Sequence, residues 1–327
     1  MVPKLGWCFL LVTVLLPRDS SEASIASTER CPISSDVCSC VFNSNSFYTV
    51  KCRNISSEDI LREAISNLND NALYLQASQL NLKYFPLKML NNVSLHTLIV
   101  ANSTFEVFRD VLKDETSLPN FVLEHLSLEN VTMYNDWNWN QLHSLRSLKV
   151  LSIYNTTIGE KITSDLSKNI NPNITAITIA ESNLTTIESG SFDKLDALKY
   201  LRICDSNLTS VSRYMLPVPS HIEQLRFENN KIHSLPCDIF NAMPNLKVVS
   251  FSNNTLSTLP EEVFKQIWRP GIHLELRGNP IKCDCRLLWT VTSETKPEDV
   301  IGHCTYPKKL FGKSLKELTV DDLTCSH

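Results

Sequence analysis

The chain has 327 residues, of which 43% are hydrophobic and 20% are charged, and its formal net charge is −4. Enough apolar residues are present to bury a core, which excludes a largely disordered chain. The small negative charge gives no reason to expect nucleic acid as a partner. The length allows one to three domains.

Residues 1–21 have the pattern of a secretory signal peptide. Lys4 is followed by the apolar stretch 5–16, which is too short to span a bilayer, and by small residues around Ser20. An uncleaved membrane anchor is the alternative. No second apolar run in the sequence approaches the roughly 20 residues that a transmembrane helix needs. We therefore expect a protein that is secreted into the extracellular space and has no transmembrane anchor.

The eleven cysteines fit secretion, because disulfides form and persist outside the cell. Cys8 belongs to the signal peptide. Eight others form two clusters, namely Cys31, Cys38, Cys40 and Cys52 near the start and Cys283, Cys285, Cys304 and Cys325 near the end. Each cluster could instead bind zinc, but the spacing typical of such sites is missing and an oxidising compartment disfavours them. Four cysteines allow three pairings, so the spacing alone leaves the connectivity open.

Nine segments between the clusters repeat the pattern L-x-x-L-x-L-x-x-N/S/T-x-L. The central residues, at position four of each unit, lie 24 to 28 residues apart and are Leu73, Leu98, Leu126, Leu151, Ile177, Leu201, Leu225, Val249 and Leu274. Positions four and six point to the same side of a short strand. One unit cannot bury these side chains alone, so successive units are predicted to stack over a shared core.

The repeats predict an α/β solenoid: a leucine-rich-repeat horseshoe with a concave parallel β-sheet, an irregular or short-helical convex side, and disulfide caps at both ends. Phe192, Phe240 and Phe264 are expected to fill the convex side. Both ends of a solenoid expose core and need covering, which assigns capping to the cysteine clusters. The predicted organisation is a signal peptide at 1–21, an N-terminal cap at 31–69, about nine repeats at 70–282 and a C-terminal cap at 283–327.

Position nine of each unit is expected to point inward and bond the backbone of the turn. Late units have an amide there, in Asn230, Asn254 and Asn279. Earlier units have Ser78, Ser103, Thr156, Ser182 and Ser206, and Val131 interrupts the series. A hydroxyl offers fewer hydrogen bonds than an amide, so we predict a less regular N-terminal half.

The motifs at both ends resemble the caps of extracellular leucine-rich-repeat proteins. Cys31-Pro32 with Cys38-Ser39-Cys40 and Cys52 is similar to the N-terminal flanking cap, and the segment 278–289 with Cys304 and Cys325 is similar to the C-terminal one. The resemblance implies the pairs Cys31–Cys40, Cys38–Cys52, Cys283–Cys304 and Cys285–Cys325. The short length and degenerate early repeats most resemble small secreted arthropod proteins named after the non-catalytic subunit of the Oplophorus luciferin 2-monooxygenase.

Strand positions three, five and seven face solvent on the concave side, where we expect a partner to bind. The candidate contact residues are Tyr154, Tyr200, Arg202, Arg226 and Glu228. Exposed tyrosines are common at binding hot spots. Arg202 and Arg226 share a column in adjacent repeats, roughly 5 Å apart, so their charges repel unless something neutralises them. Glu228 and Asp205 could do so internally, and an acidic group of a partner is the functional alternative.

Nine N-x-S/T sequons predict glycosylation, at Asn54, Asn92, Asn102, Asn130, Asn155, Asn173, Asn183, Asn207 and Asn253. Four of them occupy position eight and two occupy position ten, so six lie where the strand turns into its exit loop. If these six carry glycans, they shield one lateral edge and leave the other side of the concave face and the caps for contacts. The alternative is that Asn, Ser and Thr are simply common in turns.

Cys204 and Cys237 remain outside both clusters. Their positions lie on different sides of a coil, too far apart for a bridge to each other. Two free thiols is one interpretation, and an intermolecular disulfide through one of them is the other.

The sequence has no nucleophile motif, Gly-rich phosphate loop or metal-ligand spacing, so we expect no catalysis, cofactor or metal site. We predict a secreted protein that binds an extracellular protein or glycan. The alternatives are a non-catalytic stabilising subunit of a secreted hetero-oligomeric complex and an extracellular-matrix component.

Overall fold

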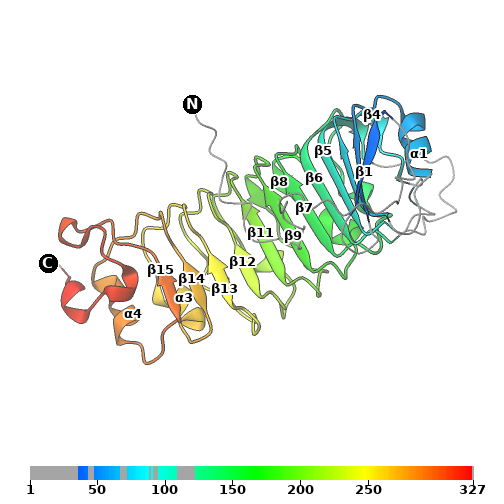
Figure 1. The fold of residues 1–327 in the computed structure, drawn as a ribbon. Helices are drawn as coiled ribbons and strands as arrows, with labels where there is room; N and C mark the ends of the chain where they lie inside the picture. The colour runs from blue at the N-terminus through cyan, green and yellow to red at the C-terminus, as the bar shows by residue number, and fades with distance from the viewer. Residues whose placement is uncertain are drawn as a thin grey trace.

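The structure is a computed structural model that describes residues 36–42, 48–66, 72–87, 90, 95–108 and 122–325. These residues form a long, gently curved solenoid with one cap at each end (Figure 1). The predicted signal peptide 1–21, together with Cys31 and Asn92, lies outside the described residues. No helix in the described parts of the chain is long and apolar enough to cross a membrane.

One sheet runs the length of the solenoid, and each repeat contributes one strand to it. From the N-terminal cap to the C-terminal cap its strands are β1 Cys38–Phe42, β2 Tyr48–Arg53, β3 Ala72–Ser78, β5 Thr97–Val107, β6 His125–Met133, β7 Val150–Tyr154, β9 Ala176–Ala180, β11 Tyr200–Cys204, β12 Gln224–Arg226, β13 Val248–Ser250, β14 His273–Glu275 and β15 Asp299–Ile301. All neighbours from β2 to β15 are parallel, whereas β1 is antiparallel to β2. β4 (Asn81–Tyr84) also pairs with β5. The predicted concave parallel sheet is therefore confirmed.

The register follows the predicted position-four residues in all units but the first. Leu98 pairs with Leu126, and the column continues in register to Leu274. In the first unit Leu75 pairs with Leu98, so the assignment of Leu73 was wrong by two residues. A shift of two keeps every side chain on its original face, so alternation alone does not reveal it. Position nine of this unit is consequently the buried Leu80 and not Ser78.

The convex side returns the chain through short elements. They are α1 Glu58–Ser66, η3 Trp139–Leu142, β8 Lys161–Ile162, α2 Asp165–Asn169, β10 Thr186–Ile187, η4 Arg213–Met215, α3 Glu261–Phe264 and η5 Lys265–Ile267. The C-terminal cap adds η6 Cys285–Leu287, α4 Leu288–Thr292, η7 Lys308–Leu310, η8 Leu315–Glu317 and η9 Val320–Asp322. Phe192, Phe240 and Phe264 are buried as predicted. The rings of Phe227 and Phe251, at position six of successive units, stack with centroids 5.6 Å apart.

Position nine differs between the two halves of the solenoid. The buried Asn254 side chain accepts a hydrogen bond from Ile232 N at 2.9 Å and donates to Phe227 O and Phe251 O at 2.7 and 3.0 Å. The Ser103 hydroxyl accepts only from Leu80 N at 3.0 Å and donates only to Ala101 O at 2.7 Å. In the Ser103 unit the strand continues through the turn, which makes β5 eleven residues long, whereas β13 has three. The two halves therefore differ in the bonding of position nine and in strand length, and the lower regularity of the N-terminal half stays a prediction.

Candidate interaction surface

The concave face has partly exposed side chains on β3, β5, β6 and β7 as well as on β11 to β14. Tyr200, at position three of β11, has 38% of its surface exposed. The next strands add partly exposed polar side chains, among them Gln224, His273 and Glu275. The neighbouring strand β9 differs, because all five of its residues are buried. β9 therefore separates a partly exposed N-terminal part of the concave face from the part on β11 to β14, which includes the exposed Tyr200.

Arg202 and Arg226 share one carboxylate. The Arg202 Nε and Arg226 Nη1 atoms each lie 3.2 Å from a different oxygen of Glu228. The three side chains are only 10 to 13% exposed. The column of like charges is thus neutralised within the protein by Glu228, which is the internal alternative stated for the sequence. The three residues form an ion-paired group on the concave face beside Tyr200.

Tyr154 is less available than its position in the repeat suggested. Its ring packs against Ala180 and Cys204. Burial raises the pKa of the Tyr154 phenol above its usual value of 10.0. Of the two tyrosines predicted as anchors, Tyr200 is therefore the exposed one.

A second set of charges, which the sequence reasoning missed, lies along the strand starts at position two. We call it the leading edge. The Glu223 carboxylate lies 3.6 Å from Lys199 Nζ and 2.8 Å from Lys247 Nζ, and these three residues come from three successive repeats. Glu124 holds His96 and Lys149 in the same way, at 3.7 and 2.5 Å. The signal was available in the sequence, since the signs alternate at the repeat spacing.

The opposite lateral edge, which we call the exit edge, is built from position eight. All its members have positive φ between 44° and 73°, and they are Gln79, Asn102, Asn130, Asn155, Glu181, Asp205, Asn229, Asn253 and Gly278. Asn tolerates this left-handed conformation better than most residues and Gly pays no steric cost for it. The turn geometry therefore explains why Asn recurs at this position.

Side-chain amides on the exit edge bond from repeat to repeat. Asn130 Nδ2 donates to Asn102 Oδ1 at 2.8 Å, and Asn155 Nδ2 donates to Asn130 Oδ1 at 3.1 Å. Asn253, Asn229 and Asp205 form a second such ladder, with bonds of 2.7 and 2.8 Å. A side-chain amide has two N–H groups and each of these bonds uses one. The second remains available as the attachment point for a glycan.

The sequon asparagines within the described residues are accessible. Asn54, Asn102, Asn130, Asn155, Asn173, Asn183 and Asn253 are exposed, and Asn207 is partly exposed. Six of these eight lie on or directly after the exit edge. This placement allows the glycan-covered edge that the sequence predicts, and glycosylation itself stays a prediction.

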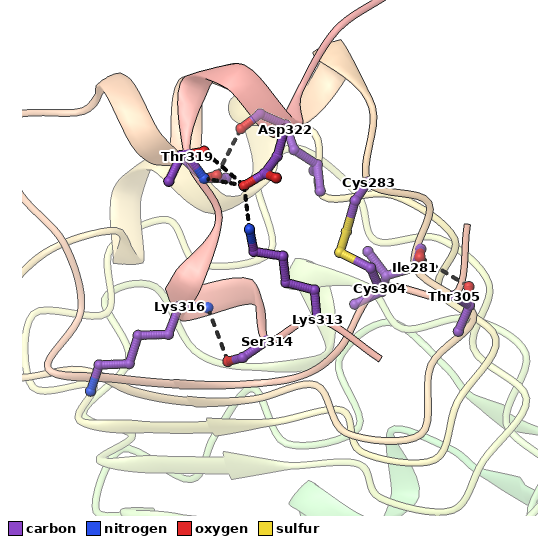
Figure 2. Close-up of a disulfide and its surroundings, with 11 residues drawn as sticks. Ile281, Cys283, Cys304, Thr305, Lys313, Ser314, Lys316, Thr319 and Asp322 are labelled. Atoms are coloured by element: carbon purple, nitrogen blue, oxygen red, sulfur yellow. Dashed lines mark hydrogen bonds and ion pairs between the residues drawn. A yellow bond between two sulfur atoms is a disulfide. The ribbon is translucent and has the colours of Figure 1, made fainter. Parts of the chain in front are cut away.

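Three of the implied disulfides are present. Cys38 is bonded to Cys52 across β1 and β2, Cys283 to Cys304, and Cys285 to Cys325. Cys40 is also disulfide-bonded. Figure 2 shows the Cys283–Cys304 bond beside the segment that carries Lys313 and Lys316.

Cys204 and Cys237 differ from one another. Cys204 is buried and takes part in a disulfide, which contradicts the interpretation that it is a free thiol. Cys237 is exposed and has a free thiol.

Asp322 joins Lys313 and Thr319 within the C-terminal cap, and we call these three residues the Asp322 clasp. Asp322 Oδ2 accepts hydrogen bonds from Lys313 Nζ at 2.7 Å and from the backbone N–H and hydroxyl of Thr319, both at 2.8 Å (Figure 2). The bond from Lys313, followed by those from Thr319, lowers the pKa of Asp322 from 3.8 to about 2. Among the described residues, no three His, Cys, Asp or Glu side chains come together as a metal site.

Comparisons with known proteins agree with this architecture. Residues 160–270 match the BspA type leucine rich repeat region, in six copies. The fold is that of a leucine-rich-repeat solenoid. A chain of the octameric complex of latrophilin 3 (Lec, Olf), Unc5D (Ig, Ig2, TSP1) and FLRT2 (LRR) is similar, with a TM-score of 0.60 and 19% identity over 89% of this chain and 99% of that chain.

A second solved structure and the sequence search complete the comparison. Human 5T4 (Wnt-activated inhibitory factor 1, trophoblast glycoprotein) gives a TM-score of 0.49 and 15% identity over 91% of this chain and 100% of that chain. No curated protein matches the chain significantly in sequence.

Proposed function

We propose that this chain is a secreted, non-catalytic leucine-rich-repeat protein that binds another protein or a glycan in the extracellular space. Its leader, residues 1–21, is removed, and the remainder divides into a cap at 31–69, repeats at 70–282 and a cap at 283–327. The observation that supports the proposal is the surface on β11 to β14, where exposed Tyr200 lies beside the largely buried, internally neutralised group of Arg202, Arg226 and Glu228.

The Arg202–Glu228–Arg226 group supports recognition because its side chains are already held in place before a partner binds. A side chain that is already held by ion pairs loses little conformational freedom on binding. An aromatic ring beside such a group can bury a large area at a small entropic cost. The FLRT2 (LRR) complex, whose similar chain shares this fold, contains several different proteins, and this supports a role in protein–protein contact.

The two lateral edges of the sheet determine from which side a partner can reach the proposed binding surface. We propose that glycans on Asn102, Asn130, Asn155, Asn183, Asn207 and Asn253 cover the exit edge. The leading edge, with Glu223 and its two lysines, then forms the unshielded border of the binding face. Glycopeptide mapping that finds these six sites mostly empty would contradict this part of the proposal.

The test compares two exposed tyrosines in the secreted glycoprotein. Tyr200→Ala removes the proposed anchor, and Tyr214→Ala removes a ring on the convex side that is 65% exposed. A partner captured by cross-linking from the native extracellular fluid should be lost with the first variant and retained with the second. Equal recovery with both variants would place the contact elsewhere and overturn the proposal.

The same captured material distinguishes two alternative functions of the protein. The resemblance to the non-catalytic luciferin monooxygenase subunit predicts a partner recovered in constant stoichiometry on size exclusion. An extracellular-matrix component predicts recovery mainly in the insoluble fraction. A covalent dimer through Cys237 would be visible as a change in gel mobility on reduction.

A further inference from the structure

The C-terminal cap carries the most exposed large apolar side chain in the described part of the chain. Phe311 is 73% exposed, and Tyr306 in the same loop is 60% exposed. A solitary exposed apolar residue needs no explanation, but two aromatic rings on one short loop form a feature that proteins usually reserve for contacts.

The loop is rigid and does not fold its rings inward. Its ends are joined by two backbone bonds of 2.9 Å, from Gly312 N to Cys304 O and from Cys304 N to Lys313 O. Cys304 is tied to Cys283 by a disulfide, and Leu310 is buried in the cap. A further bond of 2.9 Å joins Leu310 N to Pro307 O, so η7 forms a tight turn directly before Phe311. The outward position of Phe311 is therefore fixed by the cap itself.

The segment that contains the loop is rich in lysine. The segment 300–316 contains four lysines and no Asp or Glu. Lys313 is paired with Asp322, and Lys316 lies 3.9 Å from Asp299. Lys308 and Lys309 are exposed and form none of the ion pairs found among the described residues. Two unpaired ammonium groups thus directly precede the exposed Phe311.

We propose that this loop, residues 305–313, attaches the protein to anionic lipid membranes, with the rings of Phe311 and Tyr306 entering the headgroup region and Lys308 and Lys309 contacting the lipid phosphates. Aromatic side chains favour the membrane interface, and lysines near it are attracted to anionic lipids. A stable protein contact buries about 800 Å² on each partner, which two rings cannot supply, whereas a bilayer accepts a small wedge without a complementary surface. The chemistry of the loop therefore favours a lipid surface over a protein partner.

The binding assay uses the secreted full-length glycoprotein and vesicles of phosphatidylcholine with or without phosphatidylserine. We expect sedimentation with the phosphatidylserine vesicles only, and weakening at high salt because surface charges are screened. Phe311→Ser should lower the partition coefficient about ten-fold. Replacing both Lys308 and Lys309 by Gln should lower it roughly 25-fold, at about five-fold for each lysine.

Matched variants separate this effect from a general change of surface. Tyr214→Ser removes a ring of similar exposure on the convex side, and Lys194→Gln removes an exposed lysine there, so neither should change vesicle binding. All substituted side chains are exposed, and unchanged thermal midpoints would establish that every variant is folded.

Three results would overturn the proposal. The first is no binding to either type of vesicle. The second is binding that Phe311→Ser leaves unchanged. The third is retention on a sulfated glycan column that depends on Lys308 and Lys309 but not on Phe311, which would assign the loop to an anionic glycan. Vesicle binding that remains in Tyr200→Ala would show that the loop acts independently of the concave surface.

Discussion

Glu228 Oε2 accepts a hydrogen bond from Arg202 Nε at 3.2 Å, although Arg202 lies one repeat earlier. The same carboxylate binds Arg226, so one negative charge serves two largely buried guanidinium groups. Removing the Glu228 carboxylate takes a negatively charged partner away from both guanidinium groups in a poorly solvated place.

Glu228→Gln is expected to lower the free energy of unfolding by about 3 kcal/mol, as measured by urea denaturation at neutral pH. Glu223→Gln is the matched control, because Glu223 also bridges two basic groups but its lysines are at least half exposed. The control should cost less than about 1 kcal/mol. Equal losses would show that the Arg202–Glu228–Arg226 group is no better shielded than the leading edge.

The amide at position nine is predicted to stabilise its repeat more than a hydroxyl does. Asn254→Ala removes one accepted and at least two donated bonds and should cost about 3 kcal/mol. Ser103→Ala removes one accepted and one donated hydrogen bond and should lower the free energy of unfolding by about 1.5 kcal/mol. Chemical denaturation of both variants measures the two losses. A larger loss for Ser103→Ala than for Asn254→Ala would contradict the prediction.

Gly278 ends the exit-edge column for a steric reason. A Cβ added there would lie 2.0 Å from Asn253 Oδ1, and φ is +73°. Gly278→Ala should therefore cost about 2 kcal/mol, through both backbone strain and collision. Gly159→Ala has φ of +84° with no atom within 4 Å, so it isolates the strain and should cost about 1 kcal/mol. Identical thermal shifts in the two variants would rule out the collision.

The Asp322 clasp predicts a specific pH dependence. The pKa of Asp322 is lowered in the folded protein, from 3.8 to about 2, so its stabilising contribution is complete above pH 3.8 and is lost as the pH falls through about 2. Lys313→Gln removes the largest cause and should raise the pKa of Asp322 toward 3.8. Carboxyl NMR titration measures this value directly.

Lys316→Gln serves as the control for that titration, because Lys316 approaches Asp299 and not Asp322. The Asp322 pKa should be unchanged in this variant. A wild-type Asp322 that titrates near its usual value would contradict the clasp.

The repeats were predictable because their periodicity is a property of the chain alone. The stacking column from Leu98 to Leu274 follows from spacing, and burial of Phe240 and Phe264 follows from their place in the return segment. The first unit was misplaced because Leu73 and Leu75 fall on the same face, and only pairing with Leu98 distinguishes them. A two-residue slip leaves no trace in a pattern of period two.

The surface was harder to predict, because its properties depend on neighbours from other repeats. The sequence left open whether Glu228 or an acidic group of a partner neutralises Arg202 and Arg226, and the ion pairs across two repeats show that Glu228 does so. Position within the unit suggested that Tyr154 and Tyr200 are equally available, yet only Tyr200 is well exposed. The sequons located the exit edge in the sequence. The hydrogen-bonded ladder along this edge also includes Asp205 and Asn229, which belong to no sequon.

The reversed direction of β1 has a consequence for assembly. A stack of identical parallel strands could in principle continue from one molecule into the next, since such head-to-tail contacts generate open filaments. At the N-terminal end β1 runs against the repeats, and at the other end Ser314 lies antiparallel to His303 just beyond β15. Antiparallel pairing is therefore present next to both the first and the last parallel strands, and it does not continue the parallel stacking of the repeats.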